Sequence, residues 1–345
     1  MEEVFLNLKS KVNAISLAHG GGGKISGQLI RDLILPKLNR GKLAALPDSV
    51  VLSNLGDKIA FTTDSFVVSP IFFAGGNIGS LSVHGTCNDL ACSGAQPVFL
   101  SVGLILEEGF ILGELSSVLD SMSEAADICG VEIVTGDTKV TPKGATDGIF
   151  INTAGIGKVM SNVELTASRI VPGDAVLVSG PVGNHGMAVM LGRAEFSFDF
   201  DIKSDSASVW PIVERLLSLG SGLKFLRDPT RGGLSATLNE IARLTGFTVL
   251  VDESRIPVLP EVAAAAEILG INPMEAANEG KIVAVLDRDM VDRALDLLTN
   301  CPHAAGASHI GEINAECKAR VIMKTRIGGS RVLSEPMGEL LPRIC

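Results

Sequence analysis

Residues 97–135 read PVFLSVGLILEEGFILGELSSVLDSMSEAADICGVEIVT and place a strand, a helix and a second strand in succession. Residues 97–106 form an apolar run typical of a buried strand. Residues 111–128 repeat apolar side chains at helical spacing along one stripe, and Gly130 can end that helix. Residues 131–135 again have the composition of a strand. This alternation predicts an α/β (α+β) fold in which helices cover a sheet.

The same alternation continues along the rest of the chain. A turn sequence, Val-Pro-Gly-Asp at 171–174, separates two such halves. Because 345 residues exceed the ~250–300 at which a single core stops growing, we expect two domains and a tail, 1–168, 169–328 and 329–345. Further strands are predicted over 58–63, 148–156, 175–179, 247–251, 281–286 and 320–324, and helices over 77–92, 206–219, 233–245, 259–269 and 290–299. Glycines and prolines beyond residue 328 predict a mobile tail.

Composition excludes several classes of function. The net charge of −10 without a cluster of Lys and Arg argues against a nucleic-acid partner. The sequence lacks an apolar run of the ~18 residues that a membrane span needs, so we expect a cytoplasmic protein. Six cysteines without a CxxC pair predict neither a disulfide framework nor a zinc ribbon. For His84, Cys87 and Cys92 a metal role stays open beside ordinary packing.

A glycine run is the first candidate binding element. His19 is followed by Gly20, Gly21, Gly22, Gly23 and Lys24, and apolar residues at helical spacing come next. Four glycines can turn backbone N–H groups toward phosphate oxygens, and Lys24 adds a positive charge. The pattern is not the standard P-loop, which would need Ser or Thr at position 25. A flexible linker is the alternative interpretation.

Three aspartates follow apolar segments: Asp64, Asp89 and Asp137. Mg²⁺ prefers oxygen ligands, and strand ends are where an α/β sheet collects them. Each aspartate alone is more simply a turn or cap residue, but the set predicts a magnesium site.

Two turns supply further charged candidates. Residues 227–233, RDPTRGG, set acidic and basic side chains around a turn that opens a helix, which suits phosphate binding or merely a helix start. Glu279, in the turn before the strand at 281–286, is a candidate base, with an exposed turn glutamate as the alternative.

The last residue of the sequence, Cys345, follows Leu-Pro-Arg-Ile. A thiol on a swinging segment can visit two sites in turn, as carrier arms do. Its adjacent carboxylate should raise its pKa and Arg343 should partly offset that. The residues alone therefore predict a nucleotide and Mg²⁺ site together with a reactive thiol.

Taken together, the motifs resemble those of the HypE family, the carbamoyl dehydratases of [NiFe] hydrogenase maturation in the aminoimidazole ribonucleotide synthetase superfamily. The resemblance spans nearly the whole chain. Its motifs are HGGGG at 19–23, TTD at 62–64, NDLA at 88–91, GDTK at 136–139, DPTRGG at 228–233, NEG at 278–280 and PRIC at 342–345.

The resemblance implies an N-terminal sheet that forms a barrel-like homodimer, a C-terminal α/β domain, and ATP with Mg²⁺ between them. It implies HypF as the donor that loads a carbamoyl group on Cys345, and a HypC–HypD complex as the acceptor of cyanide. Glu279 would accept a proton, Lys139 would steady the amide oxygen or phosphate, and Asp64, Asp89 and Asp137 would hold Mg²⁺. The cofactor would be bound by Gly20, Gly21, Gly22, Gly23, Lys24, Asp64, Asn88, Asp89, Asp137, Thr138, Asp228 and Arg231.

The implied reaction is an ATP-dependent dehydration of the S-carbamoyl group to a thiocyanate. Two alternatives remain at the level of sequence. One is another enzyme of the superfamily, such as a small-molecule kinase or synthetase, although none of these needs a terminal thiol. The other is a non-catalytic scaffold whose Cys345 forms mixed disulfides with a partner.

Overall fold

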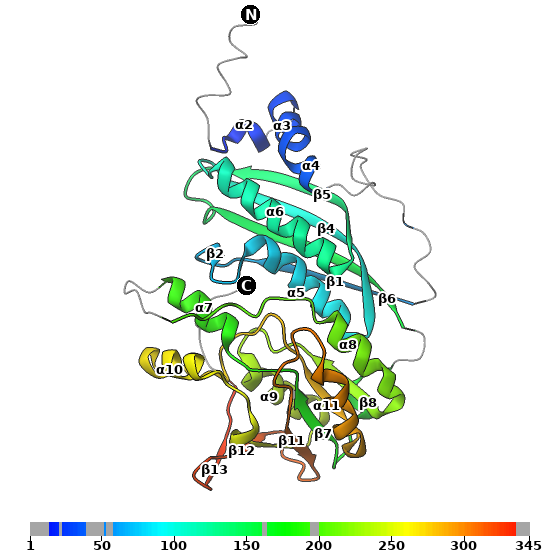
Figure 1. The fold of residues 1–345 in the computed structure, drawn as a ribbon. Helices are drawn as coiled ribbons and strands as arrows, with labels where there is room; N and C mark the ends of the chain where they lie inside the picture. Colours follow the sequence, from blue (N-terminus) through cyan, green and yellow to red (C-terminus); the bar gives the residue numbers. More distant parts are fainter. Residues whose placement is uncertain are drawn as a thin grey trace, which may run out of the picture.

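The computed structural model describes residues 14–20, 23–38, 52, 58–160, 164–193 and 200–335. These described residues build two large sheets, one in each half, which meet across helix α5 (Figure 1), and a third sheet of only two strands. This confirms the predicted two-part α/β fold. Within the described residues, no helix is both long enough and apolar enough to span a bilayer.

The N-terminal sheet has the strand order β1-β6-β4-β5. β4 and β5 are parallel because α6 crosses between them, whereas β6 is antiparallel to both β1 and β4. Helices α5 and α6 cover one face of the sheet (Figure 1). The strands are β1 Ile59–Phe66, β4 Ala95–Glu107, β5 Glu132–Thr141 and β6 Ile149–Val159, beside a short hairpin of β2 Phe72–Phe73 and β3 Gly76–Asn77. The helices are α2 Leu17–Gly20, α3 Gly23–Leu29, a π-helical turn Ile30–Ile34, α4 Leu35–Leu38, α5 Ile78–Cys92 and α6 Leu112–Cys129.

Local signals fix the ends of the two covering helices. The Asn77 side chain accepts hydrogen bonds from the backbone N–H groups of Gly79 and Ser80, and the Ser80 hydroxyl accepts one from the N–H of Asn77. This reciprocal cap satisfies N–H groups that the first helical turn leaves free. At the other boundary, Gly130 ends α6 in the left-handed conformation, at φ 68°.

On the second face of the N-terminal sheet, large apolar side chains are exposed among the described residues. Side chains alternate between the faces, so Phe61 and Ile59 of β1 point away from α5. Ile105 of β4 lies on the same face, because Phe61 pairs with Ile156 and Ile105 with Phe150 along β6. Phe61 is 68% exposed, and Ile59 is 51% exposed. Such exposed apolar residues on one sheet face are typical of a protein interface.

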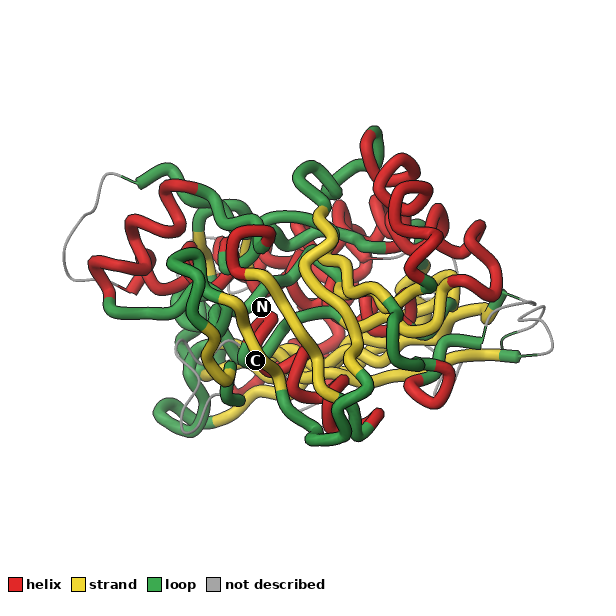
Figure 2. The backbone as a smooth tube through the Cα atoms, turned by 90° about the horizontal axis from the view of Figure 1, so that it is seen from below, coloured by secondary structure: helices red, strands yellow, loops and turns green. Residues whose placement is uncertain are grey.

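The C-terminal sheet has the order β13-β12-β9-β11-β7-β10-β8. Its inner strand β7 is buried on both faces: Leu177 belongs to one apolar cluster, and Val176 and Val178 belong to another. Seen from below, the strands cross the middle of the molecule between helices (Figure 2). The strands are β7 Ala175–Val178, β8 Leu223–Arg227, β9 Thr248–Asp252, β10 Val283–Leu286, β11 Ser308–Asn314, β12 Val321–Lys324 and β13 Ser330–Val332. The helices are α7 Asn184–Arg193, α8 Trp210–Leu216, α9 Gly233–Thr245, α10 Pro260–Leu269 and α11 Val291–Thr299, with 3-10 turns at Ala167–Arg169, Leu217–Gly222, Glu253–Arg255 and Arg288–Met290.

Most predicted elements are confirmed within a few residues, but four departures have physical causes. The helix predicted over 206–219 begins at Trp210, because residues before it bond to Asn88 of α5. Strand β11 was not predicted from the sequence, because a bulge near His309 interrupts the alternation of apolar and polar side chains. Helix α7 was not predicted either, because two glycines interrupt the pattern. Residues 330–335, expected in a mobile tail, instead form β13 and contacts to α9.

The contact between α5 and α6 depends on a glycine. A Cβ atom at Gly79 would lie 2.1 Å from the backbone oxygen of Val118. We predict that Gly79→Ala costs about 1–3 kcal/mol of unfolding free energy, despite the better helix propensity of alanine. Denaturant unfolding measures the cost.

Gly113→Ala is the matched control, because Gly113 occupies the same position in the first turn of α6 and a Cβ atom added there would meet no other atom within 4 Å. This variant should be neutral or slightly more stable. Equal losses in the two variants would contradict the packing explanation.

Candidate active site

A cleft of about 390 Å³ opens between the two halves of the chain. Its walls come from β1 and α5 on the N-terminal side and from β8, α9 and the turn at Glu279 on the C-terminal side. Five residues selected from the sequence lie together here, although they come from separate motifs. The lining residues are Thr63, Asp64, Gly85, Asp89, Arg227, Asp228, Thr230, Arg231, Ala236, Thr237, Glu240, Arg243, Glu279 and Glu335.

Asp64 of β1 and Asp89 of α5 are the carboxylates in the N-terminal wall of the cleft. The Oδ1 atom of Asp64 accepts a hydrogen bond from the backbone N–H of Ser65 at 2.9 Å and lies 3.1 Å from Nη2 of Arg231. The Oδ2 atom of Asp89 accepts a hydrogen bond from the hydroxyl of Thr62 at 2.9 Å. Burial raises the pKa of Asp64, while the Arg231 guanidinium lowers it.

Asp228 and Glu279 are the buried carboxyl groups of the cleft. Glu279 is 2% exposed, so the alternative of an exposed turn glutamate is wrong. Burial raises the pKa of Glu279 well above its usual value, and the charges of Asp228 and Asp205 add to that. For Asp228, burial and then the charge of Asp89 raise the pKa to about 7. Removing these carboxylates from water disfavours their charged forms.

Carboxyl groups outnumber guanidinium groups in this cleft, six against three among its lining residues. All three arginines already have acidic partners: Arg227 pairs with Glu240 at 3.2 Å, Arg243 pairs with Glu335 at 3.1 Å, and Arg231 pairs with Asp64. Carboxylates are the hard oxygen ligands that a divalent cation prefers, and such a cation would neutralise part of their negative charge. The pKa values of Asp64, Asp228 and Glu279 are raised where no cation is present. Asp64 and Asp89 are two such donors, and a Mg²⁺ ion held by them would take its other ligands from phosphate and water, because no third His, Cys, Asp or Glu among the described residues completes a metal group with them.

A second cavity, of about 230 Å³, lies along the β5 edge of the N-terminal sheet. Its walls are apolar side chains from the first helices and from β4, and its polar part is Gly20, Asp137, Thr138 and Lys139. Lys139 Nζ lies 3.4 Å from Asp137 Oδ2. The remaining lining residues are Ser26, Ile30, Ile34, Leu35, Leu38, Val102, Leu104, Ile133, Thr135 and Gly136.

Asp137 does not join Asp64 and Asp89 within one chain. β5 and β1 are the opposite edges of the four-stranded sheet, so three strand spacings of ~4.8 Å separate them. A cation bound at ~2.1 Å from its ligands cannot bridge that span. The structure thus divides the predicted magnesium set between two cavities.

Asn88 also has a different position from the one expected of a cofactor ligand. It is 2% exposed, and its amide nitrogen donates to the backbone oxygens of Ala207 and Glu279, each at 3.0 Å. Its oxygen accepts from the N–H of Val209 at 2.9 Å. Asn88 therefore joins α5 to the C-terminal half and fixes the backbone of Glu279.

Residues 333–335, the last that the structure describes, are held at this cleft. Asn239 and Ser235 of α9 donate hydrogen bonds to the backbone oxygens of Leu333 and Ser334, at 3.0 and 2.9 Å. Glu335 then lines the cleft. Cys345 lies outside the described residues, as do Gly21 and Gly22, and the side chain of Lys24 is not described either.

The open metal role of His84, Cys87 and Cys92 receives no support from the geometry. Among the described residues, no group of three or more His, Cys, Asp or Glu side chains is arranged around a metal position. His84 bonds to Ser206 at 3.0 Å, and Cys87 packs in the N-terminal core. Sequence reasoning missed Asp205, Lys281 and Glu335; only the position of Lys281 directly after the Asn-Glu-Gly motif could have signalled it.

Comparison with known proteins identifies the family to which both halves of the chain belong. Residues 47–159 match the N-terminal domain, and residues 171–324 the C-terminal domain, of AIR synthase related protein. The chain is 46% identical to the carbamoyl dehydratase HypE of Rhizobium leguminosarum bv. viciae over 96% of this chain and 95% of that protein.

Solved structures agree with these matches. A hydrogenase maturation protein HypE in complex with ATP has a TM-score of 0.91 at 44% identity, covering 96% of this chain and 99% of that one. The matching chain of a HypE–HypF complex has a TM-score of 0.78 at 42% identity, covering 89% and 99%. Fold and cleft thus define an AIR synthase related protein. Within that class the chain belongs to the HypE carbamoyl dehydratase family, as its motifs predicted.

The raised pKa of Asp228 predicts a pH-dependent stability. Because its folded-state pKa of about 7 exceeds the ordinary 3.8, folding favours the protonated form, and this group's contribution to stability falls as pH rises through that interval. Asp228→Asn mimics the protonated form. In chelator-treated buffer, its advantage in unfolding free energy over the parent should grow by about 1–3 kcal/mol from roughly pH 5 to pH 8.

Asp296→Asn, an exposed position on α11, is the control and should show no such growth. Thermal or urea unfolding at both pH values gives the comparison. An advantage of Asp228→Asn that shrinks with rising pH would overturn the assignment.

Proposed function

We propose that this protein carries a carbamoyl group on the sulfur of Cys345 and uses ATP to dehydrate it to a thiocyanate, which supplies cyanide ligands for the iron of [NiFe] hydrogenase. The supporting observation is the anchorage of residues 333–335 on α9, with Glu335 in the wall of the Glu279 cleft. Ten further residues of at most ~3.4 Å each give Cys345 a reach of roughly 30 Å from that point.

The chemistry needs an activated oxygen and a base. Attack of the amide oxygen on the γ-phosphorus of ATP releases ADP and forms a C–O–P linkage. Transfer of one N–H proton to a base gives the O-phosphorylated imine, and the second N–H proton leaves with the phosphate as the C–O bond breaks, which leaves S–C≡N. Dehydration therefore requires a group that accepts a proton from nitrogen and a site that excludes water.

Glu279 meets both requirements in this proposal. Its nearly complete burial keeps bulk water from the reacting nitrogen, and a carboxylate with a raised pKa is a stronger base than an ordinary one. Arg231, whose Nη2 lies 3.1 Å from Asp64, is the positive charge beside it. A Mg²⁺ ion held by Asp64 and Asp89 would neutralise charge on the transferring phosphoryl group.

The second cavity suits the rest of the nucleotide. Apolar walls from Ile30, Ile34 and Leu104 can enclose a base, and Thr138 and Lys139 offer polar contacts to phosphate or to the amide oxygen. We keep Gly20, Gly21, Gly22, Gly23, Lys24, Asp137 and Arg231 as proposed nucleotide contacts. Asp137 is assigned to the nucleotide in this cavity, since it lies too far from Asp64 to share an ion within the chain.

Cys345→Ala tests the function directly. In the intact chain incubated with HypF as carbamoyl donor and then Mg-ATP, intact-mass analysis of the peptide containing Cys345 should show a carbamoyl gain followed by loss of one water. The alanine variant should show neither, while its ATP affinity stays within about twofold, because the thiol is not part of the nucleotide site.

The outcomes separate the alternatives. Carbamoyl loading without ATP-dependent loss of water would indicate a carrier or scaffold, and mass changes retained in Cys345→Ala would exclude Cys345 as the attachment point. HypF as donor and a HypC–HypD complex as acceptor are part of the proposal. So is a cytoplasmic location, since the reaction consumes ATP.

A homodimer is the second part of the proposal. The face of the N-terminal sheet opposite α5, where Phe61, Ile59 and Ile105 are exposed among the described residues, would be buried if two copies closed their sheets into a barrel. An isologous contact of this kind explains why an apolar face lies opposite the helices.

Phe61→Asp should convert the dimer to a monomer, because two carboxylates would have to be buried at the contact. Size-exclusion chromatography with light scattering measures the mass. Ile128→Asp is the control, since Ile128 is 70% exposed on α6 at the other face. A dimeric Phe61→Asp, or a monomeric parent chain, would refute the proposed interface.

A further inference from the structure

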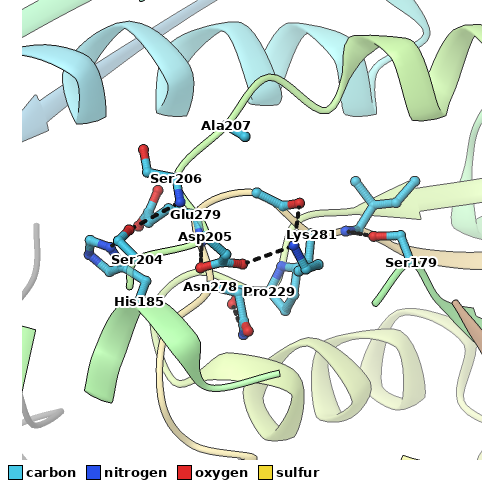
Figure 3. A network of polar contacts seen from close by, with 12 residues as sticks. Ser179, His185, Ser204, Asp205, Ser206, Ala207, Pro229, Asn278, Glu279 and Lys281 are labelled. Carbon is cyan, nitrogen blue, oxygen red and sulfur yellow. Dashed lines mark hydrogen bonds and ion pairs between the residues drawn. The ribbon is translucent and has the colours of Figure 1, made fainter. Parts of the chain in front are cut away.

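A buried polar network surrounds the backbone of Glu279 (Figure 3). Its centre is Asp205, whose Oδ1 accepts the backbone N–H of Glu279 at 3.2 Å. Its Oδ2 lies 3.5 Å from Nζ of Lys281, an ion pair rather than a short hydrogen bond. The side chains are 4% and 8% exposed, so both charges are removed from water. Neither residue lines the cleft.

The network holds the backbone around Glu279 at three atoms. Asp205 accepts from its N–H, Asn88 donates to its oxygen at 3.0 Å, and Lys281 donates to the oxygen of Gly280 at 3.2 Å. Because these backbone atoms are fixed, the Cα atom from which the Glu279 side chain extends has a fixed position. Its Oε2 lies beneath Gly85 of α5, where an added Cβ would be 3.8 Å away.

Glycines give the charged pair its space. At Gly280 an added Cβ would lie 1.9 Å from the backbone oxygen of Asp205, so the two segments approach more closely than a side chain allows. At Gly180 an added Cβ would lie 3.0 Å from Cε of Lys281. The aliphatic part of Lys281 and the Asp205 segment therefore fit only because positions 180 and 280 are glycines without side chains.

Two histidines tie the Asp205 segment to neighbouring helices. His185 of α7 bonds to the hydroxyl of Ser204 at 2.7 Å (Figure 3), and His84 of α5 bonds to that of Ser206 at 3.0 Å. Burial lowers the pKa of each histidine to about 4, so both are neutral near pH 7. The ion pair of this network is therefore the contact between Asp205 and Lys281.

We propose that the Asp205–Lys281 ion pair is a positioning device that fixes Glu279 for proton abstraction from the carbamoyl nitrogen. This inference rests on the proposed function and deepens it. A buried pair is weak evidence for stability by itself, since desolvation offsets much of its attraction. Its contacts with the backbone of residues 279 and 280 give it a specific effect, because small misplacements of a base reduce reaction rates strongly.

The experiment measures single-turnover dehydration in the full-length protein. HypF first loads the carbamoyl group, and Mg-ATP then starts the reaction, followed by intact mass of the peptide that contains Cys345. Lys281→Met should slow the loss of water about 10–100-fold, with the ATP concentration for half-maximal rate changed less than about twofold. Lys281→Arg, which keeps the charge, should recover a large part of the rate, as should the charge-matched double variant Asp205→Asn/Lys281→Met relative to Lys281→Met.

Lys224→Met is the matched control. Lys224 is a buried lysine of the same half that pairs with Asp174 at 2.6 Å and Asp287 at 2.7 Å, away from the Glu279 turn. Its variant should lose stability in thermal unfolding but keep the dehydration rate per folded molecule.

Three results would overturn the proposal: an unchanged rate in folded Lys281→Met, a rate loss that only follows the folded fraction as in Lys224→Met, or a rate loss entirely removed by excess ATP. If Lys281→Met fails to fold, the same criteria apply to Lys281→Gln, which also removes the positive charge and keeps a polar side chain. Failure of the parent chain to convert its carbamoyl group would reject the proposed function instead, which is a distinct outcome.

Discussion

The amide of Asn88 is the contact on which the site depends. Helix α5 lies between the N-terminal sheet and the C-terminal half, and its buried Asn88 binds the backbone of residues 207, 209 and 279. Three hydrogen bonds to a buried amide leave little freedom for the halves to move apart, because each unsatisfied polar atom would be costly in that environment. The cleft therefore has a fixed back wall, and Glu279 has a fixed place within it.

Charge gives that wall its chemistry. Asp64, Asp89, Asp228 and Glu279 converge from four separate elements, and their mutual repulsion and burial raise the pKa values of Asp64, Asp228 and Glu279. A protein that only needed stability would avoid such a cluster. A protein that binds a cation beside a phosphoryl group, and needs a strong base next to it, gains from the same arrangement. The carboxylates of this cleft therefore lower the stability of the fold while they serve the function of the site.

The family membership of the chain could be predicted from short motifs, because these segments have local sequence signatures. The relation between motifs could not. Asp137 follows an apolar strand just as Asp64 does, yet the order β1-β6-β4-β5 puts them at opposite edges. Glu279 has the sequence context of an exposed turn, but residues 204–209 cover it. Nothing local to Asp205 indicates that it holds the backbone of a residue 74 positions later.

The sequence alone determined the α/β class and most strands and helices, because periodicity, caps and glycine turns act over a few residues. Its short motifs determined the family, and through that resemblance the type of chemistry. The tertiary structure decided which carboxylates share a cleft, which asparagine is structural, and where residues 333–335 lie. Those outcomes depend on strand order and on the contact between two halves. Both are set by packing and desolvation across long separations, which no local pattern records.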